Sequence, residues 1–339
     1  MKVLRLVRAG EFVLADEPLP AVGEGESLVR VGSVGLCGSD LHWFGQGSIG
    51  DALLQRPLVL GHEFGGTVEG GPLDGTRVAV DPAITCGVCP RCREGNGNLC
   101  PFVRFAGHGS TDGGLREYIA WPTHLLHPVP DSFSDSTVAL LEPFGVALHA
   151  FDLGHMRFAA SVGVVGCGPI GLMTVMVARA AGASAIVAVE PLEHRREAAS
   201  RAGADLVITP EQVPAQVSAQ LSSQGPELDV VFEVAGNDEA VTAAMQLVRP
   251  GGRVVLVGIP DDDMTRFPAS LARRKGLSIL LARRMKEAYP RAIDLVERKV
   301  VDLAPLVSHR YPLVGAAGAF EVAERREGLK TVVVAAPEA

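Results

Sequence analysis

The sequence predicts an α/β protein in which an irregular, β-rich domain precedes a doubly wound parallel sheet. Its 339 residues exceed what one ordinary core needs, which favours two domains. Residues 1 to about 144 are rich in Gly, Pro and short β-like runs, whereas apolar runs alternate with helical stretches over residues 145–283. Such alternation is typical of a parallel sheet covered on both faces. The alternative is one large α/β domain with a β-rich extension.

The β-like runs of the first domain are short, and turn residues separate them. Long loops between short strands often carry functional side chains. The runs are SLVRVGSVG (27–35), EFGGTVEG (63–70), TRVAVDP (76–82) and LREYIAW (115–121).

The second domain is predicted from six apolar runs with helical stretches between them. The predicted strands are 161–166, 185–190, 204–209, 228–236, 253–259 and 276–282, and the predicted helices are 169–182, 191–203, 210–224 and 237–252. The last segment, 284–339, offers two helices (289–299 and 315–328) and a strand (330–336). It is too short for a core of its own, so we expect it to return to the first domain.

Composition excludes some classes of function. The chain is 47% hydrophobic and 21% charged. Its net charge is −8, so binding to the phosphates of nucleic acid is not favoured. No run approaches the roughly 18 to 20 apolar residues of a membrane-spanning helix. The first residues, MKVLRLVRAGEFVL, lack the apolar centre of a secretory signal, so we expect a cytoplasmic protein.

The segment GCGPIG (166–171) matches the pattern G-x-G-x-x-G at the end of an apolar strand and the start of a helix. Gly166 would make the tight turn, Gly168 would let a pyrophosphate approach the backbone, and Gly171 would let helix and strand pack closely. Together with Pro169 and Ile170, they would place the pyrophosphate on the N-terminus of the helix.

Glu190 ends the next predicted strand, 19 residues after Gly171. A carboxylate at this place accepts hydrogen bonds from the adenosine ribose and repels the 2′-phosphate of NADP, which favours NAD. Arg195 and Arg196 lie nearby and could weaken that preference, so NADP stays open as an alternative. The plainer interpretation of the glycines is ordinary turn geometry.

Four of the six cysteines lie close together in TCGVCPRCREGNGNLC (85–100). Four thiolates in a loop fit a closed, structural zinc site. Paired C-x-x-C spacing also occurs in redox motifs and iron–sulfur proteins, but a redox pair needs only two thiols. In a reducing compartment, metal binding is favoured over disulfides. The cysteines are Cys86, Cys89, Cys92 and Cys100.

A second metal site is a hypothesis built on scattered residues. Cys37, His62, Glu63 and Glu142 offer sulfur, nitrogen and oxygen donors, as a catalytic zinc with one open position requires. A lone Cys or His is more often simply packed in a core. The dinucleotide pattern and the four-cysteine lobe shift the balance toward a catalytic site.

The chain resembles the zinc-containing medium-chain alcohol and polyol dehydrogenase family, and within it the sorbitol dehydrogenase and L-idonate 5-dehydrogenase branch. The resemblance covers nearly the whole chain. Besides the four-cysteine lobe, the segments that carry it are GLCGSDLH, RPLVLGHEFGGTV, DGGLREY, EPFGVALHA, GCGPIGL, PGGRVVLVG and PLVSHRYPL.

The resemblance implies a GroES-like catalytic domain (1–144, with 284–339 returning to it), a Rossmann domain (145–283) and an active site in the cleft between them. It implies one catalytic zinc on Cys37, His62 and Glu63, one structural zinc, and NAD or NADP. Glu142 would be a fourth ligand or would hold the zinc-bound water. Relatives are commonly homotetramers or homodimers.

The resemblance further implies oxidation of a secondary hydroxyl of a polyol or sugar acid to a ketone. Ser39 would pass the substrate proton outward, with His42 next in line, although Ser39 could be only a turn residue. Arg284 matches an arginine near the nicotinamide. Trp43 replaces a usual Tyr, and the loop after Phe105 is shorter than in idonate enzymes. Both features touch the substrate pocket, together with His108.

Other activities and classes of protein stay open. Within the family, the substrate could be a cyclitol, threonine or a simple alcohol. A zinc-free reductase of the same fold, similar to quinone reductases, would lack both metal motifs. A non-enzymatic zinc-ribbon protein would explain the four cysteines but not the glycine loop. Metal analysis separates these hypotheses, with about two, zero and one zinc ions per chain respectively.

Overall fold

Two units of the chain fold around separate cores, and each is described by itself. The computed structural model describes residues 1–336. The first unit comprises Met1–Pro143 and Lys286–Ala339, and the second comprises Phe144–Met285. Within the described residues, no helix combines the length and apolarity that crossing a bilayer requires.

A seven-stranded sheet forms the centre of the first unit. Its strands are β3 (Glu26–Gly35), β6 (Glu63–Glu69), β7 (Arg77–Val80), β10 (Tyr118–Pro122), β11 (Leu126–Pro128), β18 (Val307–Pro312) and β19 (Lys330–Val334). They follow the order β11-β7-β6-β3-β19-β18, and β10 also pairs with β3. The C-terminal segment therefore contributes two strands to the sheet, one of them next to β3.

The longest of these strands, β3, lies between β6 and β19. Gly35 pairs with Glu63 on one side and with Val332 on the other. Alternate residues of β3, such as Val29 and Val31, point into an apolar core. This central position of β3 brings the start of β6 and the last strand of the chain close together.

Smaller elements surround this sheet. The strands are β1 (Lys2–Arg8), β2 (Glu11–Asp16), β4 (Ser48–Ile49), β5 (Ala52–Leu53), β8 (Ala83–Ile84) and β9 (Arg104–Phe105). The helices are α1 (Gly38–Gln46), α2 (Pro90–Arg93), α3 (Asp135–Ala139), α10 (Tyr289–Glu297) and α11 (Ala316–Glu324), and α4 (Leu141–Gly154) runs on into the second unit. The 3-10 turns of the unit are Gly71–Leu73, Gly97–Leu99, Thr123–Leu125, Ala304–Leu306 and Leu313–Gly315.

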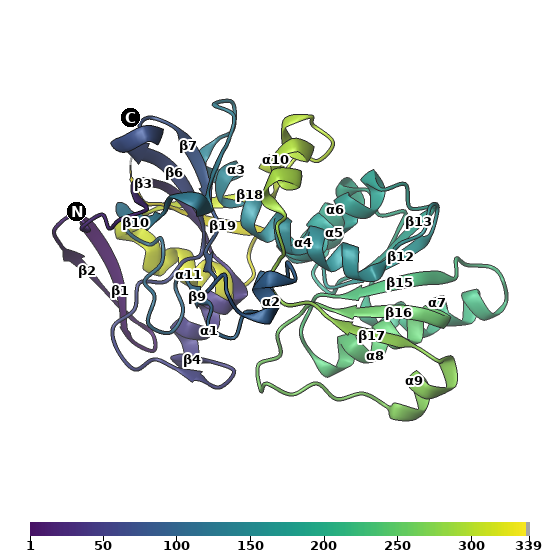
Figure 1. Cartoon of the computed structure of the whole chain (residues 1–339). Coiled ribbons are helices and arrows are strands. Elements are labelled where there is room, and N and C mark those ends of the chain that lie inside the picture. Colours follow the sequence, from purple (N-terminus) through teal and green to yellow (C-terminus); the bar gives the residue numbers. More distant parts are fainter. Residues whose placement is uncertain (337–339) are drawn as a thin grey trace. The chain divides into compact units, whose positions relative to one another are not determined.

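The second unit is a parallel sheet with helices on both faces (Figure 1). Its strands are β12 (Ser161–Val165), β13 (Ala185–Val189), β14 (Leu206–Ile208), β15 (Leu228–Glu233), β16 (Val248–Leu256) and β17 (Ser278–Leu281). The order β14-β13-β12-β15-β16-β17 reverses direction between β12 and β15. Dinucleotides bind at such a switch point in this fold.

The helices of this unit separate into two groups, as Figure 1 shows. One face carries α5 (Pro169–Ala180) and α6 (Glu193–Ala202); the other carries α7 (Val213–Leu221), α8 (Asp238–Leu247) and α9 (Ala269–Lys275). The 3-10 turn Pro210–Gln212 leads into α7. The predicted α/β class is thus confirmed, with a β-rich unit and a doubly wound parallel sheet.

One boundary of the sequence prediction was wrong. The predicted helix 237–252 ends at Leu247, and β16 begins at Val248 rather than at Arg253. Pro250 has no N–H to donate, and Gly251 has a left-handed φ of 71°, so the helix cannot continue. Val248 pairs with Leu228 before the register shifts, so the strand starts ahead of this irregular segment.

Candidate metal centre and cofactor site

The four cysteines of the lobe form a cluster whose spacing fits one zinc ion. The Sγ–Sγ distances are 4.0 Å for Cys86–Cys92, 3.5 Å for Cys89–Cys92 and 4.0 Å for Cys89–Cys100. Four Zn–S bonds of about 2.3 Å in a tetrahedron would place the sulfurs roughly 3.8 Å apart. A disulfide requires about 2.05 Å, and all four thiols are free.

The backbone of the lobe is arranged around these sulfurs. The N–H of Cys89 donates to Sγ of Cys86 at 3.4 Å, and the N–H of Cys86 donates to Sγ of Cys100 at 3.5 Å. Hydrogen bonds from the backbone of Val88 and Cys89 lower the pKa of Cys86 to about 6, which favours a thiolate. Four protein donors leave no position for a substrate, so the cluster suits a structural metal.

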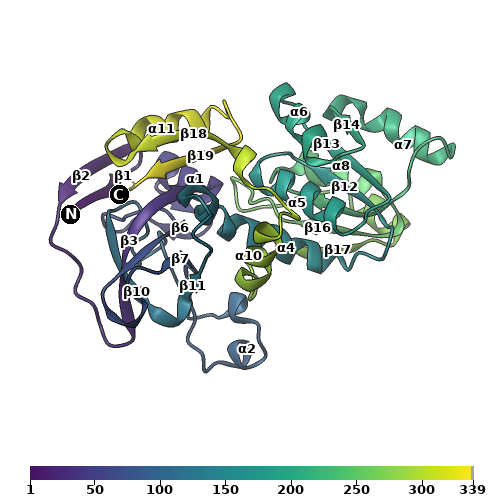
Figure 2. The same ribbon diagram turned by 90° about the horizontal axis from the view of Figure 1, so that it is seen from above.

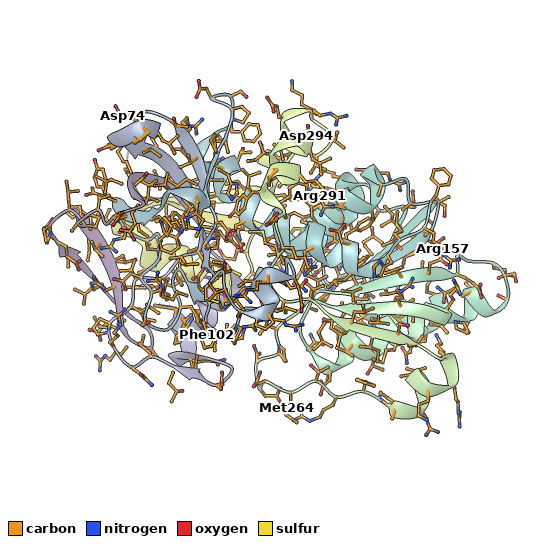
Figure 3. The ribbon with its side chains drawn as sticks, viewed as in Figure 1. Asp74, Phe102, Arg157, Met264, Arg291 and Asp294 are labelled. Atoms are coloured by element: carbon orange, nitrogen blue, oxygen red, sulfur yellow. The ribbon has the colours of Figure 1, made fainter. Side chains whose placement is uncertain are left out.

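The lobe is a projection of the first unit. Figure 2 shows α2, which begins directly after Cys89, on a loop that extends away from the strands of that unit. Phe102 follows the last cysteine and is 69% exposed (Figure 3). A metal bound by the four cysteines would fix the shape of such a projecting loop.

A second group of donors lies at the start of α1 and of β6. Ligand atoms of Cys37, His62 and Glu63 all lie within 4.8 Å of one another. Cys37 is the N-cap residue of α1, so its thiol lies at the start of that helix. Three donors of mixed type with a small separation fit a zinc site that keeps a position for substrate. The structure therefore brings together three of the four predicted catalytic ligands.

Glu142 is buried near this group but is not one of its close members. Burial raises the pKa of Glu142 to about 8, against the opposing charge of His62 and with further help from the charge of Glu63. Its carboxylate is thus within electrostatic range of two donors.

Asp40 is a further candidate residue of this site that the sequence interpretation did not name. Its Oδ1 lies 3.6 Å from Nδ1 of His62, and both side chains are buried. Its carboxylate also accepts hydrogen bonds from the N–H of Cys37 (3.0 Å) and of Gly61 (3.1 Å). Burial opposes ionisation, but His62 and these N–H groups lower the pKa of Asp40. A carboxylate behind a histidine ligand fixes its orientation and tautomer.

A sequence signal for Asp40 exists. Asp40 stands three residues after Cys37, at the third position of α1, and receives the N–H of the N-cap residue. This is the reciprocal arrangement of a capping box, in which an acidic residue at this position caps the helix start. A thiol in place of the usual Ser or Thr conceals the pattern.

Three of the predicted pocket residues take part in two aromatic pairs. The rings of His62 and Phe105 lie 5.2 Å apart, and Trp43 meets His108 edge-on at 5.4 Å. Trp43 is only 2% exposed and belongs to the apolar core of the first unit. Phe105 therefore lies beside the candidate ligand His62, and His108 lies beside Trp43.

The two residues proposed for proton transfer share one helix. Ser39 and His42 are both half-buried in α1, three residues apart, so their side chains lie on neighbouring positions of the helix surface. Arg284 lies in the second unit, is half-buried and has a left-handed φ of 51°. A left-handed conformation is uncommon for an arginine.

The glycine loop has the geometry that a pyrophosphate needs. Gly166 has a φ of 96°, and a Cβ added at Gly171 would overlap the carbonyl oxygen of Gly166. At Gly168 a Cβ would approach only Nη1 of Arg195, at 3.7 Å, so the backbone there is open. The loop leads into the N-terminus of α5, which favours an anion.

The carboxylate of Glu190 is hydrogen-bonded to the backbone of the same loop. It is buried, and its Oε2 accepts the N–H of Cys167 at 2.7 Å while Oε1 accepts the N–H of Leu192 at 3.0 Å. The guanidinium of Arg196 donates to the carbonyl of Glu190 at 3.1 Å. The carboxylate is therefore fixed at the end of β13, with lone pairs left for a ribose hydroxyl.

Two family models match the chain. The model described as alcohol dehydrogenase GroES-like domain matches residues 23–131, and the model described as zinc-binding dehydrogenase matches residues 169–298. Sorbitol dehydrogenase of Bacillus subtilis is 34% identical, over 98% of this chain and 97% of that protein. Sorbitol dehydrogenase of Gallus gallus is 36% identical, over 97% of this chain and 95% of that protein.

Solved structures agree with this likeness. L-idonate 5-dehydrogenase of Escherichia coli superposes with a TM-score of 0.90 at 27% identity, over 98% of this chain and 97% of that one. An E. coli protein described as short chain alcohol dehydrogenase, solved with NADH, has a TM-score of 0.89 at 27% identity, over 98% and 99%. A zinc-binding dehydrogenase of Sinorhizobium meliloti, solved with NADP, has a TM-score of 0.89 at 29% identity, over 98% of this chain and 98% of that one.

Proposed function

The chain belongs to the zinc-containing medium-chain alcohol and polyol dehydrogenases, and we propose that it oxidises a secondary hydroxyl of a polyol or sugar acid to a ketone. The observation that carries the proposal is the group of Cys37, His62 and Glu63 donors within 4.8 Å of one another. When bound, zinc supplies Lewis acidity toward the substrate hydroxyl, and a nicotinamide cofactor accepts the hydride.

The chain's own residues hold and orient these groups. Cys37, His62 and Glu63 would bind the catalytic metal, and Asp40 would keep His62 in one orientation. Glu142 would act as a further ligand or as a hydrogen-bond acceptor beside the metal. A carboxylate at this position, where simple alcohol dehydrogenases have Cys, supports a polyol or sugar acid over a simple alcohol.

The substrate proton would leave along α1. The hydroxyl of Ser39 would accept it from the substrate hydroxyl and donate its own proton onward, either to His42 or to a ribose hydroxyl of the cofactor. The three-residue spacing of Ser39 and His42 on one helix supports this order. Phe105 and Trp43 would exclude water from the reacting carbon.

NAD is the proposed cofactor. Glu190 is fixed at the end of β13, and a second negative charge from a 2′-phosphate would meet it there. Arg195, whose Nη1 faces Gly168, supports binding of the cofactor's phosphates. The NADP-bound relative makes NADP the alternative to test.

A substrate panel tests the proposal most directly. Purified enzyme is offered L-idonate, sorbitol, a cyclitol, threonine and a simple secondary alcohol, with NAD or NADP, and NADH or NADPH formation is followed by absorbance. We expect the highest kcat/KM with a polyol or sugar acid and NAD. Preference for threonine or a simple alcohol would replace the proposed substrate class while leaving the family unchanged.

A matched variant tests the metal. His62→Ala should abolish oxidation while NADH binding and thermal stability stay near those of the wild type. His309→Ala, at a half-buried position of the edge strand β18, is the control and should keep full activity. Near-normal turnover of His62→Ala would exclude a catalytic metal at this site.

A further inference from the structure

A lysine is buried next to the candidate metal centre. Lys330 opens β19 and its side chain is 3% exposed. Its ammonium forms an ion pair with Oε2 of Glu63, whose side chain is 1% exposed, and donates a hydrogen bond to the carbonyl of Leu36 at 2.8 Å. Lysine is almost never fully buried unless a partner offsets its charge, so this pair is a specific feature of the site.

The order of the strands brings these two residues together. β19 and β6 are neighbours of β3 on opposite sides, and Gly35 of β3 pairs with Glu63. Gly35 has no side chain, so the side chains of Lys330 and Glu63 meet across it. A Cβ at Gly35 would lie 3.1 Å from Cε of Lys330 and would overlap Oε2 of Glu63. The glycine, the lysine and the glutamate form one packed arrangement.

The ammonium of Lys330 also contributes to the charge balance of the site. It is close enough to interact electrostatically with Cys37 and Asp40 as well as with Glu63. A divalent zinc and one ammonium would balance three anionic groups, namely the thiolate and the two carboxylates. Without the lysine, a buried negative charge would lack compensation.

We propose that Lys330 is a positioning residue of the metal centre: its ammonium occupies Oε2 of Glu63, so this carboxylate offers the metal only Oε1. This inference rests on the metal site of the proposed function. A free carboxylate could bind through both oxygens and fill the position that the substrate needs. The lysine thereby keeps Glu63 a one-oxygen ligand and the metal open to substrate.

The alternative is that Lys330 only joins β19 to the sheet. Metal spectroscopy separates the two roles, because a structural lysine would change stability but not the coordination of the metal. Cobalt is exchanged into the Cys37–His62–Glu63 site while zinc stays in the four-cysteine lobe, with one of each per chain verified by metal analysis. The visible d–d bands of Co²⁺ weaken and shift when its coordination number rises.

The variants are Lys330→Met, Lys330→Gln and Lys330→Arg. Met removes both charge and donor, whereas Gln keeps a donor for the Leu36 carbonyl and so protects the fold. We expect weaker, shifted d–d bands for Met and Gln, with kcat/KM lowered roughly tenfold or more, and a spectrum close to wild type for Arg. In a Glu63→Gln background, Lys330→Met should leave the Co²⁺ spectrum unchanged, because the lysine acts through Glu63.

The matched control is Lys275→Met. This second lysine, in the other unit, donates to the carbonyls of Gln246 and Val248, and its loss should lower stability without altering the Co²⁺ spectrum. Wild-type d–d bands in Lys330→Gln, even with lower stability, would overturn the inference. Failure of the wild-type protein to bind Co²⁺ with a thiolate charge-transfer band would instead overturn the metal site itself.

Discussion

The carboxylate of Asp40 lies 3.6 Å from Nδ1 of His62, with both side chains buried beneath the candidate metal centre. The same carboxylate accepts the backbone N–H groups of Cys37 and Gly61. One side chain thus joins the N-cap of α1 to the loop before β6. It contacts two candidate metal ligands, Cys37 and His62, that are 25 residues apart in the sequence.

Asp40→Asn should weaken the catalytic metal without unfolding the protein. The amide keeps one acceptor oxygen but loses the charge that orients His62, and loss of such a partner costs about 10–100-fold in metal affinity or activity. Zinc retained after dialysis against a chelator should fall from two ions per chain to one. Asp135→Asn is the control, because Asp135 pairs with Arg77 within the same unit. Equal zinc retention in Asp40→Asn and wild type would contradict this role.

The two metal sites should fail in different ways. Cys37→Ser should remove the catalytic zinc and the activity while the melting temperature changes little. Cys92→Ser should remove the structural zinc and lower Tm by roughly 5 °C or more, since each kcal/mol is worth about 2–4 °C in large domains. Activity per remaining zinc should persist in Cys92→Ser. Zinc content, Tm and turnover are measured on the same preparations.

Cys167→Ser is the control for both cysteine variants. Cys167 is buried in the glycine loop and belongs to neither cluster. Its substitution should leave two zinc ions per chain. A loss of activity without zinc loss in Cys37→Ser would show that this thiol is not a ligand.

Glu190→Ala should relax the choice of cofactor. The substitution removes the charge that would repel a 2′-phosphate, so the ratio of kcat/KM for NADP to that for NAD should rise at least roughly tenfold, which is about 1.4 kcal/mol. Absolute kcat/KM with NAD should fall, because the N–H groups of Cys167 and Leu192 lose their acceptor. Glu193→Ala, exposed in the first turn of α6, should leave the ratio unchanged. An unaltered ratio in Glu190→Ala would exclude Glu190 as the discriminating residue.

Local pattern was enough to predict much of the second unit. Apolar runs placed β12 and β13 to within one residue of their observed bounds, because strands buried on both faces are almost continuously apolar. The end of α8 was misplaced because residues 248–252 belong to the start of β16, and only pairing with Leu228 determines that. Propensity does not report such pairing.

The candidate metal centre was predictable only in part. Its candidate ligands are residue types whose chemistry a sequence reveals, whereas Lys330 stands in the sequence as an ordinary charged residue at the start of a predicted strand. It lies 294 residues from Leu36, whose carbonyl it contacts, and reaches Glu63 only because β19 and β6 flank β3. Long-range strand order, not local sequence, creates that contact.

The half-buried Asp81 should make the stability of the first unit depend on pH, with greater stability at low pH, where Asp81 is protonated, than at high pH, where it is ionised. Burial raises the pKa of Asp81 to about 6, against a hydrogen bond from the N–H of Ala83. Because the folded pKa exceeds the unfolded value, this stability is fully present below about pH 4 and is lost as pH rises through 6. Asp81→Asn keeps an acceptor for the N–H of Ala83 and cannot ionise. At pH 8 its free energy of unfolding should therefore exceed that of wild type by about 1–3 kcal/mol, with a higher Tm. At pH 4 the two proteins should have the same Tm. Thermal unfolding at both pH values checks this, and an equal difference at pH 4 and pH 8 would rule out ionisation of Asp81 as its cause.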